Sequence, residues 1–148
     1  MVRTDRGLAL IKQYQDNNGF INLLTFSFSL IGEGIVEYAV TPTENHLATP
    51  GFVHGGVLTT LLDATMGAGA LTLVADDEQV VSTIEMQVNF IQAAKLGEYL
   101  CCRSFPIRKG KKVIFMKAEI RNEQNNLVAV SNGSFYPFPA AKAGYKFF

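Results

Sequence analysis

The sequence predicts an α+β fold in which a mostly antiparallel sheet of about six strands wraps around one long central helix, with a short helix at the N-terminus. Three observations lead to this prediction. Residues 54–75 are almost continuously apolar and have the period of a helix. Six further segments show strand patterns. Because only one long helix is available, the sheet has to curl around it for both to bury their apolar faces.

The composition fits one globular domain that spans residues 1–148. Hydrophobic residues make up 48% of the chain and charged residues 18%, which is typical of a chain with a packed core. Thirteen basic and thirteen acidic residues cancel, so the chain lacks the positive charge expected of a nucleic-acid-binding protein. Cys101 and Cys102 are neighbours on an expected strand and point to opposite faces. We therefore expect two reduced thiols in a cytoplasmic protein.

The apolar helix is also the only candidate for a membrane span. Residues 1–15 contain no apolar run of signal-peptide length. Residues 57–75 approach membrane-spanning length, but Asp63 near the middle would cost about 2.5–3.5 kcal/mol on insertion. We therefore expect a buried helix in a protein without a membrane partner.

The first elements follow from local patterns. Residues 5–15 read as a short amphipathic helix, which Thr4 or Asp5 can cap and the Asn17-Asn18-Gly19 run ends. Residues 24–30 alternate, so we expect a strand with one buried face. Residues 32–34 form a tight turn, and residues 35–41 return as the second strand of a hairpin. A loop over residues 42–53, with Pro and Gly at several positions, leads to the long helix.

Four more strands follow the helix. They are expected over residues 80–91, 98–107, 112–121 and 127–136, with turns between them. In the first of these strands, even-numbered residues should share one face: Val80, Ser82, Ile84, Met86, Val88 and Phe90. The tail over residues 138–148 is apolar but irregular, so it either packs on a partner or is partly disordered.

One run of residues marks a family. Gly51-Phe52-Val53-His54-Gly55-Gly56, with Asp63 nine positions after His54, resembles the hotdog-fold thioesterases, in particular the phenylacetate-pathway and acyl-CoA thioesterases. The stretches Thr83–Met86 and Ala94–Glu98 and the Gly110-Lys111 turn are also similar. The likeness spans roughly residues 20–136.

The resemblance implies that a dimer hydrolyses an acyl-CoA thioester without a cofactor. In such enzymes the helix acid, here Asp63, activates water or attacks directly, and the backbone N–H of the second glycine, here Gly56, polarises the carbonyl. The family often has an asparagine six residues before the histidine. Here that residue is Ala48, with Asn45 nearby but out of register. This departure supports an alternative, a non-catalytic acyl-CoA-binding or regulatory hotdog protein. A hotdog dehydratase or hydratase would need motifs that the sequence does not show.

Asp63 and Gly56 also stand out by their chemistry. A charge on an apolar helix costs free energy unless it is paired or useful, so Asp63 is a candidate general base or nucleophile. The alternative is a buried acid that caps backbone groups or pairs with a cation. The N–H of Gly56 is an unpaired donor in the first turn, where the helix dipole favours an oxyanion. The alternative is that Gly55 and Gly56 only form a tight start of the helix.

The spacing of these two residues predicts a homodimer. Gly56 and Asp63 are seven residues apart, so they share one helix face but lie about 10 Å apart along the axis. One thioester carbonyl cannot easily reach both. Two copies related by a two-fold axis would bring Gly56 of one chain to Asp63 of the other, which gives active sites between chains. A tetramer built from such dimers is also possible.

The remaining candidate residues have two interpretations each. His54 either binds substrate or holds the loop. Thr83 matches a position where some relatives carry a hydroxyl near the attacking water, or it is an ordinary strand threonine. The basic turn with Arg108 and Lys111 either meets the phosphates of coenzyme A or is a solvated edge. We expect no metal site, because His46 and His54 lack supporting ligands.

Overall fold

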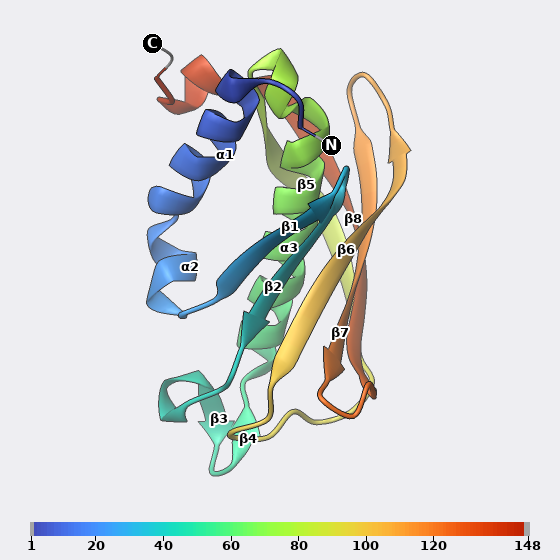
Figure 1. Cartoon of the computed structure of the whole chain (residues 1–148). Coiled ribbons are helices and arrows are strands. Elements are labelled where there is room, and N and C mark those ends of the chain that lie inside the picture. The colour runs from blue at the N-terminus through green and yellow to red at the C-terminus, as the bar shows by residue number, and fades with distance from the viewer. Residues whose placement is uncertain (1, 147–148) are drawn as a thin grey trace.

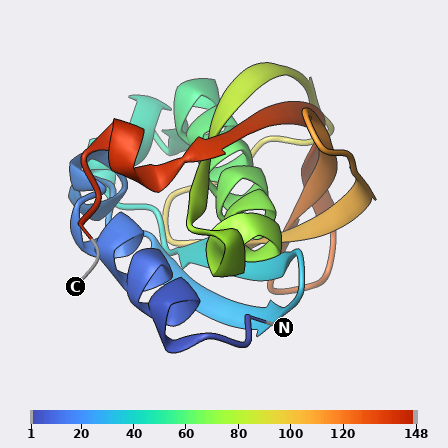
Figure 2. The same cartoon turned by 90° about the horizontal axis from the view of Figure 1, so that it is seen from above.

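The structure, a computed structural model that describes residues 2–146, has a six-stranded antiparallel sheet that curls around one long helix, α3 (Gly55–Val74) (Figures 1 and 2). The order of strands in the sheet is β1-β2-β6-β7-β8-β5. This arrangement confirms the predicted hotdog fold. The strands are β1 (Ser27–Gly32), β2 (Ile35–Val40), β5 (Gln79–Phe90), β6 (Leu100–Lys109), β7 (Ile114–Asn122) and β8 (Leu127–Pro139).

Short elements complete the fold. Before the sheet lie α1 (Asp5–Asp16) and α2 (Gly19–Leu23), and between β2 and α3 lie the 3₁₀ turn η1 (Glu44–His46) and the ribbon of β3 (Leu47–Thr49) and β4 (Phe52–Val53). Two more 3₁₀ turns follow α3 and β8, η2 (Ala75–Asp77) and η3 (Ala140–Ala143). Figure 2 shows α1 along the open side of the curled sheet, where it covers part of α3.

The helix α3 is a core helix. Together with η2 it is long and apolar enough to cross a membrane, but 78% of its most apolar stretch is buried inside the fold. Leu61, Leu62 and Met66 are completely buried. Burial of such side chains contributes roughly 1.5–3 kcal/mol each, which explains why the chain organises around this helix.

Gly69 allows the sheet to approach α3 closely. A Cβ atom at Gly69 would lie 2.8 Å from Cε of Met116 and 2.9 Å from the backbone oxygen of Gly34. At Gly67, two residues earlier, the nearest atom would be 3.6 Å away on Phe135, an ordinary contact. The two glycines therefore differ: only Gly69 is required by the packing.

The first helix is fixed at both ends. Thr4 caps α1 through its side chain, as expected, and Asp76 in η2 accepts hydrogen bonds from the N–H groups of Arg3 and Thr4 at 2.9 and 3.0 Å. Slight burial tends to raise the pKa of Asp76, but these donors outweigh it and lower the pKa. At the other end, Gln13 exchanges two hydrogen bonds with the backbone of Lys146. The tail up to Lys146 thus packs on α1, and residues 147–148 lie outside the described part.

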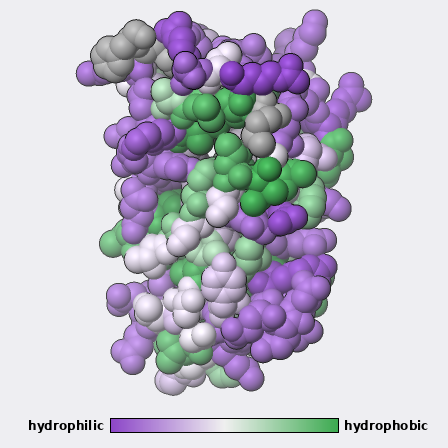
Figure 3. Space-filling model, in the orientation of Figure 1, coloured by the Kyte–Doolittle hydropathy of each residue, from purple (hydrophilic) through white to green (hydrophobic). Residues whose placement is uncertain are grey.

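The first predicted strand begins later than expected. Residues 19–23 form the short helix α2, because the Asn18 side chain accepts a hydrogen bond from the N–H of Ile21 and so caps a new turn. The predicted buried face from Phe26 to Leu30 is present. On the face of the molecule shown in Figure 3, apolar side chains gather over its middle, where β1 lies beside α1, and hydrophilic residues surround them.

The prediction that even-numbered residues of β5 share one face is wrong. The register of β5 with β8 shifts between Thr83 and Glu85, so Ile84 forms a bulge and is 54% exposed. Before the bulge Thr83 faces α3, and after it Met86 and Val88 pack against the core. Binary alternation could not reveal the extra residue, because a bulge changes the period locally.

Candidate active site

The candidate site is centred on Asp63, half-buried at the middle of α3. The hydroxyl of Thr83 on β5 donates a hydrogen bond to Oδ1 of Asp63, with 2.7 Å between the two oxygens. Both side chains line a pocket of about 430 Å³. The carboxylate therefore faces a pocket that no Lys, Arg or His among residues 2–146 lines, and its second oxygen can meet a bound water or substrate.

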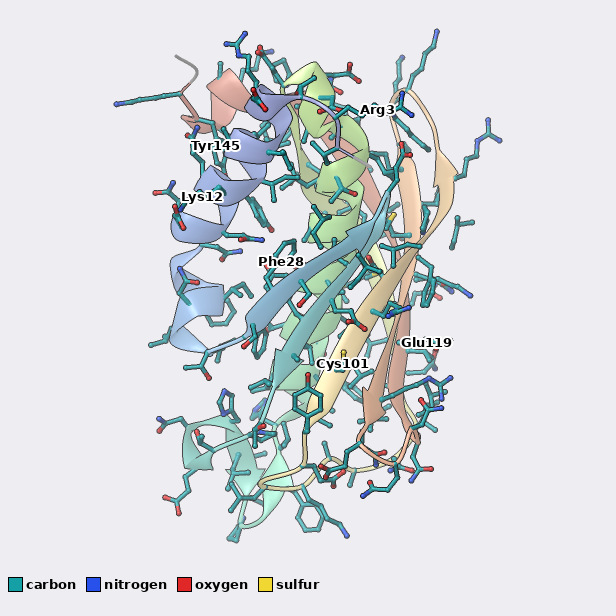
Figure 4. The ribbon with its side chains drawn as sticks, viewed as in Figure 1. Arg3, Lys12, Phe28, Cys101, Glu119 and Tyr145 are labelled. Atoms are coloured by element: carbon teal, nitrogen blue, oxygen red, sulfur yellow. The ribbon has the colours of Figure 1, made fainter. Side chains whose placement is uncertain are left out.

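The pocket changes character along its length. Thr60 lies beside Asp63 and Thr83 at the first end, and its hydroxyl donates to the backbone oxygen of Gly56 at 2.7 Å. Its apolar lining comes from Phe20, Ile21, Ala64, Val81 and Phe135, and its uncharged polar lining from Tyr14, Asn17, Asn18 and Tyr145. The Tyr14 oxygen lies near Gly67, one helical turn beyond Asp63, and Tyr145 lies near Tyr14, so we call this side of the pocket its far end. Figure 4 shows Tyr145 beside α1, so both terminal segments close the pocket.

The start of α3 is arranged differently from the prediction. His54 is the N-cap of the helix, and its Nδ1 accepts a hydrogen bond from the N–H of Gly56 at 2.7 Å. This is the donor that the sequence assigned to an oxyanion. Capping side chains are usually Ser, Thr, Asp or Asn, so the role of a histidine was not foreseen. Both groups are exposed, which leaves a substrate free to compete for the N–H.

The loop before α3 brings the other predicted residues to the same end of the helix. The backbone N–H of His54 donates to the oxygen of His46 at 2.8 Å, which ties η1 to the helix start. His46 itself is buried, and its Nε2 lies 2.7 Å from the backbone oxygen of Leu24, so it supports the loop. Asn45 and Ala48 are exposed. Ala48 offers no side-chain polar group, which leaves a carbonyl without an amide donor from this position.

The basic turn lies at the opposite end of α3. Lys109, Gly110 and Lys111, which follow Arg108, line a hollow of about 280 Å³ together with Val74 and other residues around the end of the helix. Val74 is eighteen residues beyond Gly56, or about 27 Å along the axis. Within one chain, Arg108 and Lys111 are therefore not brought together with Gly56, whereas Asp63 and Thr83 are brought together.

The cysteines lie outside this site. Cys102 is completely buried, and the half-buried Cys101 places its Sγ 3.4 Å from Oε2 of Glu37, on the sheet face seen in Figure 4. Burial raises the pKa of the Cys101 thiol to about 11, and the negative charge of Glu37 acts in the same direction. Among residues 2–146, no three His, Cys, Asp or Glu side chains come together in a way that could hold a metal ion.

Sequence reasoning missed the far end of the pocket. Tyr14 lies on α1, for which the sequence predicted an amphipathic helix without placing Tyr14 on its buried face. A signal was present, since Tyr14 is three residues after Ile11 and four after Leu10, the spacing of one helix face. Tyr145 carried no comparable signal, because the tail has no regular pattern.

Comparisons with known proteins agree with the fold and identify the family. The family model described as "Thioesterase superfamily" matches residues 50–129. A protein of Saccharolobus solfataricus whose name proposes an esterase is 30% identical over 105 residues, which cover 71% of each chain. The PaaI protein of the E. coli phenylacetic acid degradation operon superposes with a TM-score of 0.79 at 20% identity and covers 90% of this chain and 94% of its own. A hypothetical thioesterase of Streptococcus pneumoniae, solved with coenzyme A, has a TM-score of 0.76 at 20% identity, covering 87% and 97%.

Proposed function

Because the chain belongs to the thioesterase superfamily, we propose that it hydrolyses acyl-CoA thioesters to a free carboxylic acid and coenzyme A. The observation that carries this proposal is the carboxylate of Asp63, which Thr83 holds at the edge of an acyl-sized pocket. The coenzyme A bound to the S. pneumoniae protein, which shares the fold, supports the choice of thioester.

In the proposed reaction, Asp63 takes a proton from a water molecule, and the oxygen of that water attacks the thioester carbonyl carbon. The carbonyl oxygen becomes an oxyanion, which the N–H of Gly56 stabilises at the positive end of the helix dipole. The tetrahedral intermediate then expels the coenzyme A thiolate, and Asp63 passes its proton to the thiolate sulfur. Thr83 fixes the rotamer of Asp63 so that one carboxylate oxygen points to the water.

The substrate carbonyl has to displace His54 from the N–H of Gly56. The exchange replaces one hydrogen bond with another, and both partners are at the surface, so its net cost is small. A protein in which His54 kept this N–H would bind acyl-CoA without turning it over. Two observations favour a second candidate function, a non-catalytic acyl-CoA-binding protein: His54 occupies the N–H of Gly56, and Ala48 supplies no amide.

The geometry of β5 supports a dimer with shared sites. β5 is an edge strand of twelve residues whose outer edge is unpaired in the single chain. Long free edges are templates for pairing with a second chain. Along β5, Thr83 lies beside Asp63, to which it is hydrogen-bonded. The ring of Phe90 lies beside the start of α3, 3.4 Å from the position that a Cβ atom of Gly55 would take.

Self-pairing of β5 brings these two positions together. If two β5 strands pair antiparallel about a two-fold axis near Gln87, Phe90 of one copy lies opposite the bulge at Ile84 of the other, beside Thr83. The start of one α3 then lies next to Asp63 of the other chain. The same rotation brings the partner's basic turn toward the start of α3, where Arg108 and Lys111 are suited to the coenzyme A phosphates.

Steady-state hydrolysis of a panel of acyl-CoA thioesters tests the activity. We expect turnover by the wild type and a loss of at least about a thousandfold in kcat for Asp63→Asn, with binding of coenzyme A retained. Binding of acyl-CoA by the wild type without turnover would support the second candidate. Single turnover in H₂¹⁸O, together with hydroxylamine trapping of a mixed anhydride, then separates the two roles of Asp63: ¹⁸O in the carboxylate or a trapped anhydride identifies a nucleophile, and an unlabelled carboxylate without a trapped anhydride identifies a general base.

Mixed dimers test the shared site. Asp63→Asn and Gly56→Pro, which removes the N–H, should each be inactive alone. After unfolding and refolding together, half of the dimers are mixed, and each mixed dimer has one intact site. We therefore expect recovery of about a quarter of the wild-type activity. Absence of recovery, with mixed dimers demonstrated by mass spectrometry, would contradict sites between chains.

A further inference from the structure

The far end of the acyl pocket is polar but carries no charge. Tyr14, Asn17 and Asn18 come from α1 and the turn that follows it, and Tyr145 comes from the C-terminal segment. No Lys, Arg or His lines this pocket in the described part of the chain, so Asp63 supplies its only full charge. Asn17 Nδ2 already donates to the backbone oxygen of Gln13, and Asn18 Oδ1 accepts from the N–H of Ile21. A purely apolar acyl end would leave the proton of the Tyr14 hydroxyl without an acceptor, and an anionic end would meet no cation.

Tyr14 places its hydroxyl above α3, beyond the catalytic carboxylate. A Cβ atom at Gly67 would lie 3.9 Å from the Tyr14 oxygen, so this oxygen is close to the helix at Gly67. Gly67 is one helical turn past Asp63, about 6 Å along the axis. An extended chain of six carbons, with bonds of about 1.5 Å, spans a similar distance from its carbonyl carbon to its last carbon.

The Tyr14 hydroxyl is available as a proton donor in a hydrogen bond. Burial raises its pKa above the ordinary value, and the negative charge of Asp63 contributes in the same direction, whereas a side-chain hydrogen bond with Asn18 opposes the shift. The phenol therefore stays protonated at neutral pH. Asp76 and Lys146 hold the two ends of α1, so Tyr14 is positioned before a substrate arrives.

We propose that Tyr14 is a specificity-determining residue that selects acyl groups of about six carbons with an apolar body and an uncharged hydrogen-bonding group at the far end. This inference rests on the proposed thioesterase function and names the substrate class of the same pocket. The apolar body contacts Ile21, Ala64 and Phe135, and the terminal hydroxyl or keto oxygen accepts a hydrogen bond from Tyr14.

Three thioesters that differ only at their last carbon test the selection. They are hexanoyl-CoA, 6-hydroxyhexanoyl-CoA and adipoyl-CoA, which end in a methyl group, a hydroxyl and a carboxylate. We expect kcat/KM for 6-hydroxyhexanoyl-CoA to exceed that for hexanoyl-CoA about tenfold, and adipoyl-CoA to be the poorest substrate. Equal values for the first two, or a preference for adipoyl-CoA, would overturn the proposal.

Two substitutions, each of which removes one tyrosine hydroxyl, show which residue causes the preference for the hydroxylated substrate. In Tyr14→Phe the ratio of kcat/KM between the hydroxylated and the plain substrate should fall from about ten to about one, because the hydroxylated substrate alone loses a hydrogen bond to the phenol, whatever common change the substitution makes to both substrates. In Tyr145→Phe the ratio should persist. Loss of the ratio in Tyr145→Phe and its retention in Tyr14→Phe would refute the assignment to Tyr14. Thermal melts of both variants show whether α1 and the tail remain packed.

Binding of thioether analogues separates this inference from the proposed reaction. S-hexyl-CoA and S-(6-hydroxyhexyl)-CoA lack the carbonyl and cannot be hydrolysed. Calorimetry on the wild type should show about tenfold tighter binding of the hydroxylated thioether. This result without hydrolysis of any thioester would contradict the proposed function and support the selection. Equal or undetectable binding of both thioethers would overturn the selection even in an active thioesterase.

Discussion

Replacing Thr83 with valine removes one hydroxyl from the carboxylate of Asp63 and keeps the size of the side chain. The bond that is lost joins two oxygens 2.7 Å apart, one of them charged. Hydrogen bonds to charged groups contribute about 1.5–3 kcal/mol, and 1.36 kcal/mol is a factor of ten in rate. If this bond orients Asp63 in the transition state, Thr83→Val should lower kcat/KM between about tenfold and a hundredfold.

The exposure of Thr83 to solvent narrows the expected range of the loss in kcat/KM. In the single chain Thr83 is exposed, so water competes for the carboxylate and the loss should be near tenfold. If the partner's β5 covers Thr83 in a dimer, water is excluded and the loss should approach a hundredfold. The change in the free energy of unfolding should stay within about 0.5 kcal/mol, as is usual for exposed positions away from the core.

Release of the coenzyme A thiol, followed with a thiol-reactive chromophore, measures kcat and KM for the wild type and for the variants. Thr83→Ser keeps the hydroxyl and is the matched control, so it should retain most of the activity. The reasoning would be refuted if Thr83→Val stayed within twofold of the wild type, or if Thr83→Ser were as impaired as Thr83→Val while both were fully folded.

Three further predictions concern the fold. Gly69→Ala should cost about 1–3 kcal/mol in urea unfolding because its Cβ meets the sheet, whereas Gly67→Ala should be neutral or slightly stabilising; equal losses would contradict the packing argument. Because the folded pKa of Asp76 lies below the ordinary 3.8, its stabilisation is present above that pH and is lost as the pH falls through the folded pKa. The difference in melting temperature between the wild type and Asp76→Ala should therefore shrink between pH 7 and pH 3, and a constant difference would argue against this linkage. Since the pKa of Cys101 is raised from 9.0 to about 11, alkylation by iodoacetamide at pH 7 should be about a hundredfold slower than for a free thiol, which mass spectrometry can follow against the unfolded chain; rapid labelling of the folded protein would be inconsistent with that pKa.

The parts of the fold that the sequence predicted are those in which one periodicity runs through a whole element. The apolar helix over residues 54–75 and the strands around it are confirmed because burial, propensity and pattern agree there. The short helix α2 was missed, since its five residues are too few for a helical pattern and its cap, Asn18, was assigned to the end of the previous helix.

The candidate site also has features that the sequence could predict and features that it could not. The proximity of Asp63 and Thr83, twenty residues apart in the sequence, followed only from the family resemblance, because no local rule relates a helix to the next strand. The capping of Gly56 by His54 was not foreseen, since the sequence shows that a donor exists but not which neighbour reaches it first. The polar end of the pocket comes from segments near both termini, where sequence distance hides spatial contact.

The bulge at Ile84 links the fold to the proposed chemistry. A regular β5 that kept Met86 and Val88 against the core would direct Ser82 and Ile84 toward α3 and Thr83 away from Asp63. The extra residue reverses the facing of the first half of the strand, so that a hydroxyl meets the carboxylate while the second half still packs. Bulges also raise the local twist and interrupt pairing. Deleting Ile84 leaves Thr83 opposite Phe135 and Glu85 opposite Ser134, so the shortened strand pairs without a bulge and still directs Thr83 toward Asp63. The deletion variant should therefore stay folded and active, whereas loss of activity in a folded deletion variant would mean that the twist or the interrupted pairing at the bulge is itself required.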